Sequence, residues 1–140
     1  MKAYLAPLML SVMACQTAAS SLDVQIDGIR SAKGKVIVSL FSQSKAFAAA
    51  DMNQAKVLTI QQAIQGSMRF RFSNLSVGEY ALIVHHDEND DGRLNEKEGI
   101  PLEGYGFSQG LGKQAAPSFD EAKLTINEGM FDSQVRLIYQ

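Results

Sequence analysis

The sequence predicts an all-β fold, a single antiparallel β-sandwich of about seven strands. Segments in which every second residue is apolar recur at short spacing, and Gly, Asn and Ser turns separate them. No helical repeat of about ten to fifteen residues lies between these segments, as a parallel-sheet fold would require. Alternation of apolar and polar residues is the mark of a strand with one buried face.

The first two strands are predicted at residues 22–26 and 35–42. The first alternates strictly, and the second is β-branched and aromatic enough to be more deeply buried. Gly28 and residues 31–34 turn the chain between them, so we expect these two strands to form a hairpin.

The middle of the chain predicts a short helix and three strands. Residues 44–56 contain an alanine run after Ser44, a candidate helix N-cap. Residues 57–60 and 67–72 alternate, with arginines on one face of the second run and apolar residues on the other. A turn at residues 74–78 precedes a strand in which Tyr80, Leu82 and Val84 share a face.

The last third predicts a long loop and two final strands. Residues 99–112 hold five glycines, which excludes a helix and favours an irregular loop. Residues 123–126 and 134–139 alternate again, and the second of these runs closes the core.

The N-terminus has the order of a secretory signal peptide. Lys2 precedes an uncharged apolar stretch, residues 3–15, and the small residues 17–21 follow it. This stretch is too short to span a bilayer permanently. We expect cleavage after Ala19, which leaves one domain at residues 20–140 in the periplasm or secreted. The alternative is a lipoprotein anchored through Cys15.

Charge and cysteine content exclude some function classes. Loss of Lys2 changes the formal charge from −2 to −3, and no cluster of Lys and Arg is present. Phosphate binding needs such a cluster, so we expect no nucleic-acid partner. Cys15 is the only cysteine, so cleavage after Ala19 leaves a domain without disulfides.

Residues 87–98, here called the acidic loop, match the calcium-loop pattern at every specified position. Calcium takes about six to eight oxygen ligands, and alternate residues of a loop bent at Gly92 supply them. The predicted ligands are Asp87, Asn89, Asp91, the carbonyl of Arg93, Asn95 and Glu98.

The context of the acidic loop differs from a helix–loop–helix calcium sensor. A strand precedes it, and Gly99 and Pro101 prevent a helix after it. Calcium here is expected to stabilise a hairpin, with a dissociation constant of about 0.1–1 mM. The alternative is an exposed turn in which Asp, Asn and Gly make only local hydrogen bonds.

Other residues suggest two further functions. Tyr105 and Phe107 lie among glycines, where they either stack on a sugar or peptide or cover one end of the core. His85, His86 and Glu103 suggest a metal-dependent hydrolase, but neighbours on a strand face opposite ways. No nucleophile motif and no phosphate-binding glycine loop is present, so no catalytic residue is assigned.

Residues 77–92 and 99–108, with the strand at 34–41 and the segment 117–122, resemble the bacterial domain-of-unknown-function family 2141. The resemblance covers nearly all of the mature chain. It implies an exported, periplasmic protein with a prealbumin-like or carbohydrate-binding-like β-sandwich and no established activity. In many relatives glycine stands where this chain has Asp90.

The leading prediction is therefore an exported, non-enzymatic module with calcium in the acidic loop. The alternatives are a module that binds a cell-envelope glycan or a protein through Tyr105 and Phe107, and a metal-dependent hydrolase.

Overall fold

The computed structural model describes residues 11, 13, 19–110, 112 and 115–140. The signal-peptide prediction depends largely on residues 1–10, 12 and 14–18, which lie outside the described residues, as does Cys15. Among the described residues no helix is long and apolar enough to cross a membrane.

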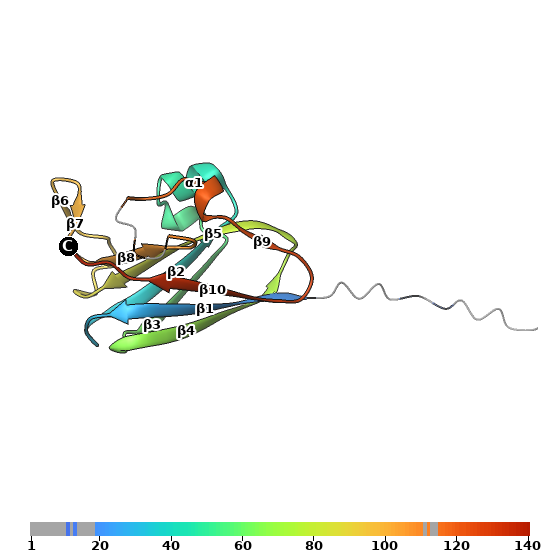
Figure 1. Ribbon diagram of the computed structural model, residues 1–140, viewed down its shortest axis with the longest axis horizontal. Helices are drawn as coiled ribbons and strands as arrows, with labels where there is room; N and C mark the ends of the chain where they lie inside the picture. The colour runs from blue at the N-terminus through green and yellow to red at the C-terminus, as the bar shows by residue number, and fades with distance from the viewer. Residues whose placement is uncertain (1–10, 12, 14–18, 111, 113–114) are drawn as a thin grey trace, which may run out of the picture.

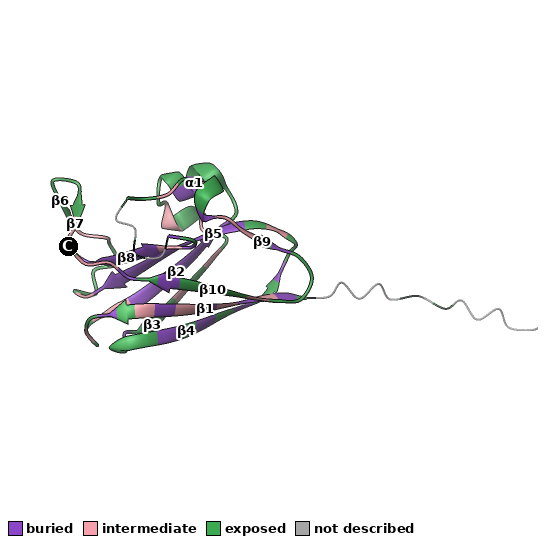
Figure 2. Cartoon of the chain, viewed as in Figure 1, coloured by how far each residue is buried: buried purple, intermediate pink, exposed green. Residues whose placement is uncertain are grey.

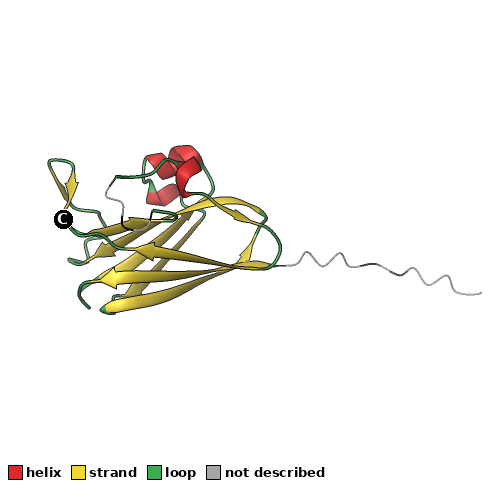
Figure 3. Ribbon diagram, viewed as in Figure 1, coloured by secondary structure: helices red, strands yellow, loops and turns green. Residues whose placement is uncertain are grey.

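The described residues form mainly strands with a few short helical turns (Figure 3). The elements in chain order are β1 (Ser20–Ile29), β2 (Lys35–Phe41), α1 (Ser44–Ala48), the 3-10 turn η1 (Met52–Gln54), β3 (Val57–Gln62), β4 (Gly66–Leu75), β5 (Gly78–Asp87), β6 (Glu96–Lys97), β7 (Ile100–Pro101), β8 (Gly104–Phe107), α2 (Phe119–Ala122), β9 (Leu124–Ile126) and β10 (Met130–Arg136).

Two sheets face each other across one core, which confirms the predicted β-sandwich (Figure 1). One sheet has the order β10-β1-β4 and the other β3-β2-β5-β8, and β9 pairs with the start of β5. The hairpin β6–β7 is separate and projects from one end of the sandwich. Most strand pairs are antiparallel, but β1 and β10 are parallel.

The expected hairpin between the first two strands is wrong, because β1 and β2 belong to different sheets. Strand β1 pairs with β4 and β10, and β2 pairs with β3 and β5. The apolar faces of both strands enter the same core from opposite sides, which buries more apolar surface than a hairpin lying in one sheet.

The glycine-rich segment is a strand at residues 104–107, not the irregular loop expected there. The glycines let the C-terminal segment approach β8 closely. A Cβ atom on Gly106 would lie 2.7 Å from Val135 Cγ1 and 2.8 Å from the Arg136 carbonyl oxygen, and one on Gly104 would collide with the Tyr139 ring. Glycine therefore permits strand packing here, although it is usually rare in strands.

The short helix expected within residues 44–56 is present, but its predicted N-cap is wrong. Helix α1 begins at Ser44, and Gln43 occupies the N-cap position without a side-chain capping bond. The helix is held instead by Phe47, which packs edge-on against Phe41 and Phe119 with ring centroids 5.9 Å apart in each pair.

A second apolar cluster lies on the outer face of the β5 sheet, beneath α1 and α2. Its buried members are Phe41, Ala46, Phe47, Ala81, Ile83 and Ala122. The burial colouring of Figure 2 shows that β5 is buried along almost its whole length. Because both faces of β5 are covered, polar residues at its end are taken out of water.

Candidate functional site

The end of β5 places two histidines and an aspartate in the protein interior. His85 is 2% exposed, His86 0% and Asp87 1%. His86 faces the core between the sheets, where its Nδ1 lies 2.7 Å from the Tyr139 hydroxyl and its Nε2 2.7 Å from the Lys33 carbonyl oxygen. His85 and Asp87, two residues apart, share the outer face, so the neighbouring histidines face opposite ways as expected.

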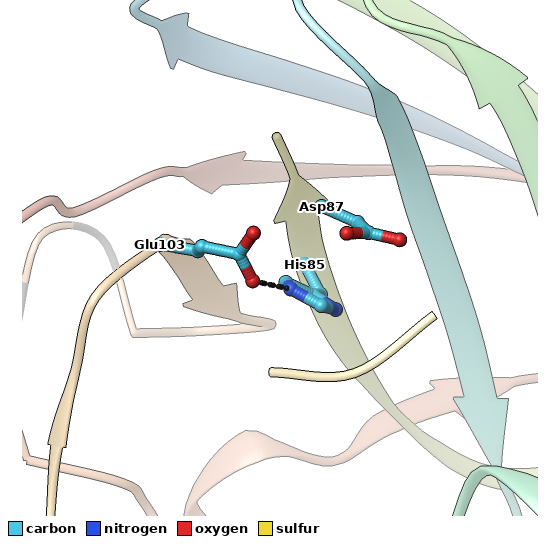
Figure 4. Close-up of side chains that lie close together, drawn as sticks. All are labelled: His85, Asp87 and Glu103. Carbon is cyan, nitrogen blue, oxygen red and sulfur yellow. Dashed lines mark hydrogen bonds and ion pairs between the residues drawn. The ribbon is translucent and has the colours of Figure 1, made fainter. Parts of the chain in front are cut away.

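Glu103, which precedes β8, is buried against His85. Its Oε2 lies 2.9 Å from His85 Nε2 and also accepts the Asn95 backbone N–H at 3.4 Å. Its Oε1 accepts the backbone N–H groups of Glu88 at 3.1 Å and Asn89 at 3.4 Å. One carboxyl group thus connects β5, two parts of the loop that follows it and the segment before β8. Figure 4 shows its contact with His85.

We call His85, Asp87 and Glu103 the buried cluster. Each of these residues has one ligand atom within 4.8 Å of a ligand atom of each of the other two. In the described part of the chain no other three His, Cys, Asp or Glu residues lie this close. Figure 4 shows Glu103 pointing toward His85, with Asp87 beside His85 on β5. Sequence reasoning had placed Asp87 in the acidic loop alone, although its separation from His85 puts both on one face of a strand.

Within the acidic loop, Asp87 accepts hydrogen bonds from the loop backbone. Its Oδ1 accepts the Asp91 N–H at 3.2 Å and its Oδ2 the Gly92 N–H at 2.8 Å. Gly92 has a φ of 74°, which supplies the predicted bend. Asp90 has a φ of 60°, a conformation that favours glycine, and this accounts for the glycine expected in relatives at that position.

The side chains of Asn89, Asp91 and Asn95 meet in one network. Asn89 Nδ2 lies 3.2 Å from both Asp91 Oδ2 and Asn95 Oδ1, and Asn95 Nδ2 donates to Asp91 Oδ2 at 2.9 Å. The hydrogen bond from Asn95, with that from the Arg93 backbone N–H, lowers the pKa of Asp91. The predicted ligands at the first, third, fifth and ninth positions of the loop are therefore brought together.

Glu88 and Asp90, which alternate with these predicted ligands, pair with basic side chains outside the loop. Arg30 donates to both carboxylate oxygens of Glu88, with Nη2 2.5 Å from Oε1 and Nε 3.2 Å from Oε2. Arg30 lowers the pKa of Glu88 chiefly through this hydrogen bond. Lys35 Nζ lies 2.9 Å from Asp90 Oδ1. The sequence did not predict these two basic partners, because Arg30 belongs to the β1–β2 connection and Lys35 to β2.

Glu98, the last predicted calcium ligand, lies apart from the network of Asn89, Asp91 and Asn95. It occupies the turn of the β6–β7 hairpin with a φ of 53°, and its side chain makes no hydrogen bond or ion pair with any described residue. The structure therefore unites Asp87, Asn89, Asp91 and Asn95 and leaves Glu98 in solvent. The Arg93 side chain is exposed on the same loop.

Tyr105 and Phe107 lie on β8 and face a groove of about 400 Å³ on the outer side of the sheet. Tyr105 is 4% exposed, and Phe107 packs against Phe47 with ring centroids 6.2 Å apart. Both rings contribute to packing at this end of the fold. They also line the groove together with His85 and Leu94, so their predicted role in ligand binding stays a prediction.

A larger surface hollow of about 780 Å³ lies over α1 and α2, away from the buried cluster. Its acidic residues include Glu79 and Asp120, and Lys123 Nζ lies 3.3 Å from a carboxylate oxygen of each. These exposed ion pairs are typical of a solvated surface.

The fold and the site define the class of the protein: a β-sandwich domain with an organised acidic loop at one end. The family model described as "Uncharacterized protein conserved in bacteria (DUF2141)" matches residues 24–133. The chain belongs to this family, which confirms the resemblance found in the sequence. No curated protein and no solved structure matches the chain.

Proposed function

We propose that this chain is an exported, non-enzymatic β-sandwich module whose acidic loop binds calcium, and that the ion stabilises the loop. The observation that carries this proposal is the separation of the loop residues into two sets. Glu88 and Asp90 pair with Arg30 and Lys35, whereas the side chains of Asn89, Asp91 and Asn95 meet in one hydrogen-bond network.

Calcium suits this second set because it is a hard cation that prefers carboxylate, amide and carbonyl oxygens. Asp91 Oδ2 accepts two amide N–H groups, and these amides can rotate to present their oxygens instead when a cation replaces the hydrogen bonds. Glu98 can act as the final ligand only if the β6–β7 hairpin moves toward the network. A site that requires such movement favours weak binding, with a dissociation constant of about 0.1–1 mM.

Thermal melting of the purified mature chain tests the proposal. In about 5 mM calcium, compared with excess chelator, we expect a stabilisation of about 1–2 kcal/mol and a rise in Tm of roughly 3–8 °C. Asp91→Asn should abolish the rise, since it removes a charged ligand and keeps an oxygen for the Arg93 N–H. Glu96→Gln, at an exposed position outside the predicted ligand set, should leave it unchanged. An identical Tm with and without calcium would contradict the proposal.

A second candidate function is the binding of a glycan or peptide in the groove beside β8. The groove favours it because Tyr105, Phe107 and Leu94 give it apolar walls and His85 a polar floor, the usual make-up of a ligand site. Binding of soluble peptidoglycan fragments to wild type and Phe107→Ala checks it. Equal binding by both proteins, or by neither, would count against this function.

A further inference from the structure

We propose that the buried cluster of His85, Asp87 and Glu103 is a second cation site, suited to a transition-metal ion such as Zn²⁺, Mn²⁺ or Fe²⁺. Its ligand set shares Asp87 with the acidic loop, one carboxylate oxygen serving each ion, but differs from it because it includes an imidazole. One histidine and two carboxylates form a mixed nitrogen and oxygen set, which transition metals accept and calcium does not prefer.

The spacing of the donor atoms supports this assignment. Ligand atoms about 2.0–2.2 Å from a metal ion lie roughly 3 to 3.5 Å from one another. His85 Nε2 and Glu103 Oε2 are 2.9 Å apart, and one atom of Asp87 joins them within 4.8 Å. Small movements of the side chains would bring all three onto one ion.

The charges in the buried cluster also favour a cation. Two carboxyl groups lie within 4.8 Å of one another, at 1% and 5% residue exposure. Within the described residues no Lys or Arg makes an ion pair with Asp87 or Glu103, since Arg30 and Lys35 pair with Glu88 and Asp90. Burial of two carboxylates is costly, and a divalent ion would add to the compensation that His85 and the backbone N–H groups supply.

The backbone around the cluster already orients the carboxylates. The N–H groups of Glu88 and Asn89 hold Glu103 Oε1, and those of Asp91 and Gly92 hold the two oxygens of Asp87. Such outer hydrogen bonds fix the direction of metal-binding carboxylates. Each oxygen has two lone-pair sites. Each Asp87 oxygen accepts one N–H and so has one site left, and Glu103 Oε2 gains a site when His85 Nε2 turns from this oxygen to the ion.

The groove beside β8 supplies access to the cluster. His85 lines this groove, and its Nδ1 makes no hydrogen bond within the described part of the chain. A metal ion takes the lone pair of Nε2, so the neutral ring that binds it is the tautomer with its single proton on Nδ1. The groove gives Nδ1–H a place to donate to water.

Titration of the mature protein with Zn²⁺ alone tests this site, with about 5 mM calcium present throughout to occupy the acidic loop. Calorimetry should show one Zn²⁺ per chain. His85→Gln should weaken Zn²⁺ binding at least about 100-fold, because the amide retains a hydrogen bond to Glu103 but is a poor metal ligand. Asp91→Asn is the matched control: it should lose the calcium response and keep its affinity for Zn²⁺.

Nitrogen chemical shifts of the two imidazoles give a second measurement that needs no variant. Zn²⁺ should shift Nε2 of His85 and leave both nitrogens of His86 unchanged, because His86 faces the opposite side of the sheet. Absence of binding at about 1 mM Zn²⁺, equal affinity in His85→Gln, or a shift confined to His86 would each overturn the proposal. Since the calcium response is scored separately in Asp91→Asn, failure of one site is distinguishable from failure of the other.

Discussion

His85 Nε2 and Glu103 Oε2 lie 2.9 Å apart on the outer face of the β5 sheet, and both side chains are almost completely buried. Because Glu103 also accepts the backbone N–H groups of Glu88 and Asn95 in the acidic loop, this pair ties the loop to the sandwich. The loop is therefore organised by the protein itself, and a bound cation would add to an arrangement that exists without it.

Replacement of Glu103 should destabilise the fold strongly. Glu103→Ala leaves His85 and the N–H groups of Glu88, Asn89 and Asn95 without their acceptor, so we expect a loss of about 3–5 kcal/mol in the free energy of unfolding. Urea denaturation in excess chelator measures it. Glu98→Gln, at an exposed position in the β6–β7 hairpin, should change the free energy by less than about 0.5 kcal/mol. Equal effects of the two substitutions would contradict the role assigned to Glu103.

The Arg30–Glu88 pair should make stability depend on pH. Arg30 lowers the pKa of Glu88 below the ordinary value of 4.5, so the folded state favours the carboxylate. The resulting stabilisation is fully present above pH 4.5 and is lost as the pH falls through the lowered pKa. Arg30→Gln should therefore be less stable than wild type near neutral pH, and the difference should vanish at about pH 2–3. Urea denaturation of both proteins across this range checks it, and a difference that grows toward low pH would refute it.

The glycines of β8 should be intolerant of a side chain. In Gly106→Ala the new Cβ would collide with Val135 and the Arg136 carbonyl, so we expect a loss of about 1–3 kcal/mol. Gly78→Ala is a suitable control, because its nearest contact would be at 3.9 Å and its backbone is not left-handed. Thermal melting of the two variants compares them. An unchanged Tm in Gly106→Ala would show that β10 does not pack against β8 as described.

Local patterns in the sequence predicted most strands and which of their faces are buried. Met68, Phe70 and Phe72 are buried and Arg69 and Arg71 exposed, as the alternation in that segment indicated. The pairing of the strands was not predictable in the same way. Alternation fixes which face of a strand is buried but not its neighbour, so the pairing of β1 with β10, more than one hundred residues away, left no local signal.

The buried cluster was only partly predictable for a similar reason. His85 and Asp87 share a strand face by their spacing alone, but Glu103 reaches them only because β8 pairs with β5 in the register that sets Gly104 opposite His86. The glycines of β8 suggested a loop instead. Helix α2 was missed although its start carries a local signal, the capping box of Ser118 and Glu121.

The most direct test of the calcium proposal is calorimetric titration of calcium into the metal-free mature chain. We expect one site with a dissociation constant of about 0.1–1 mM, absent in Asp91→Asn. No binding heat in wild type at several millimolar calcium, or the same heat in Asp91→Asn, would show that the acidic loop is an ordinary hydrogen-bonded turn.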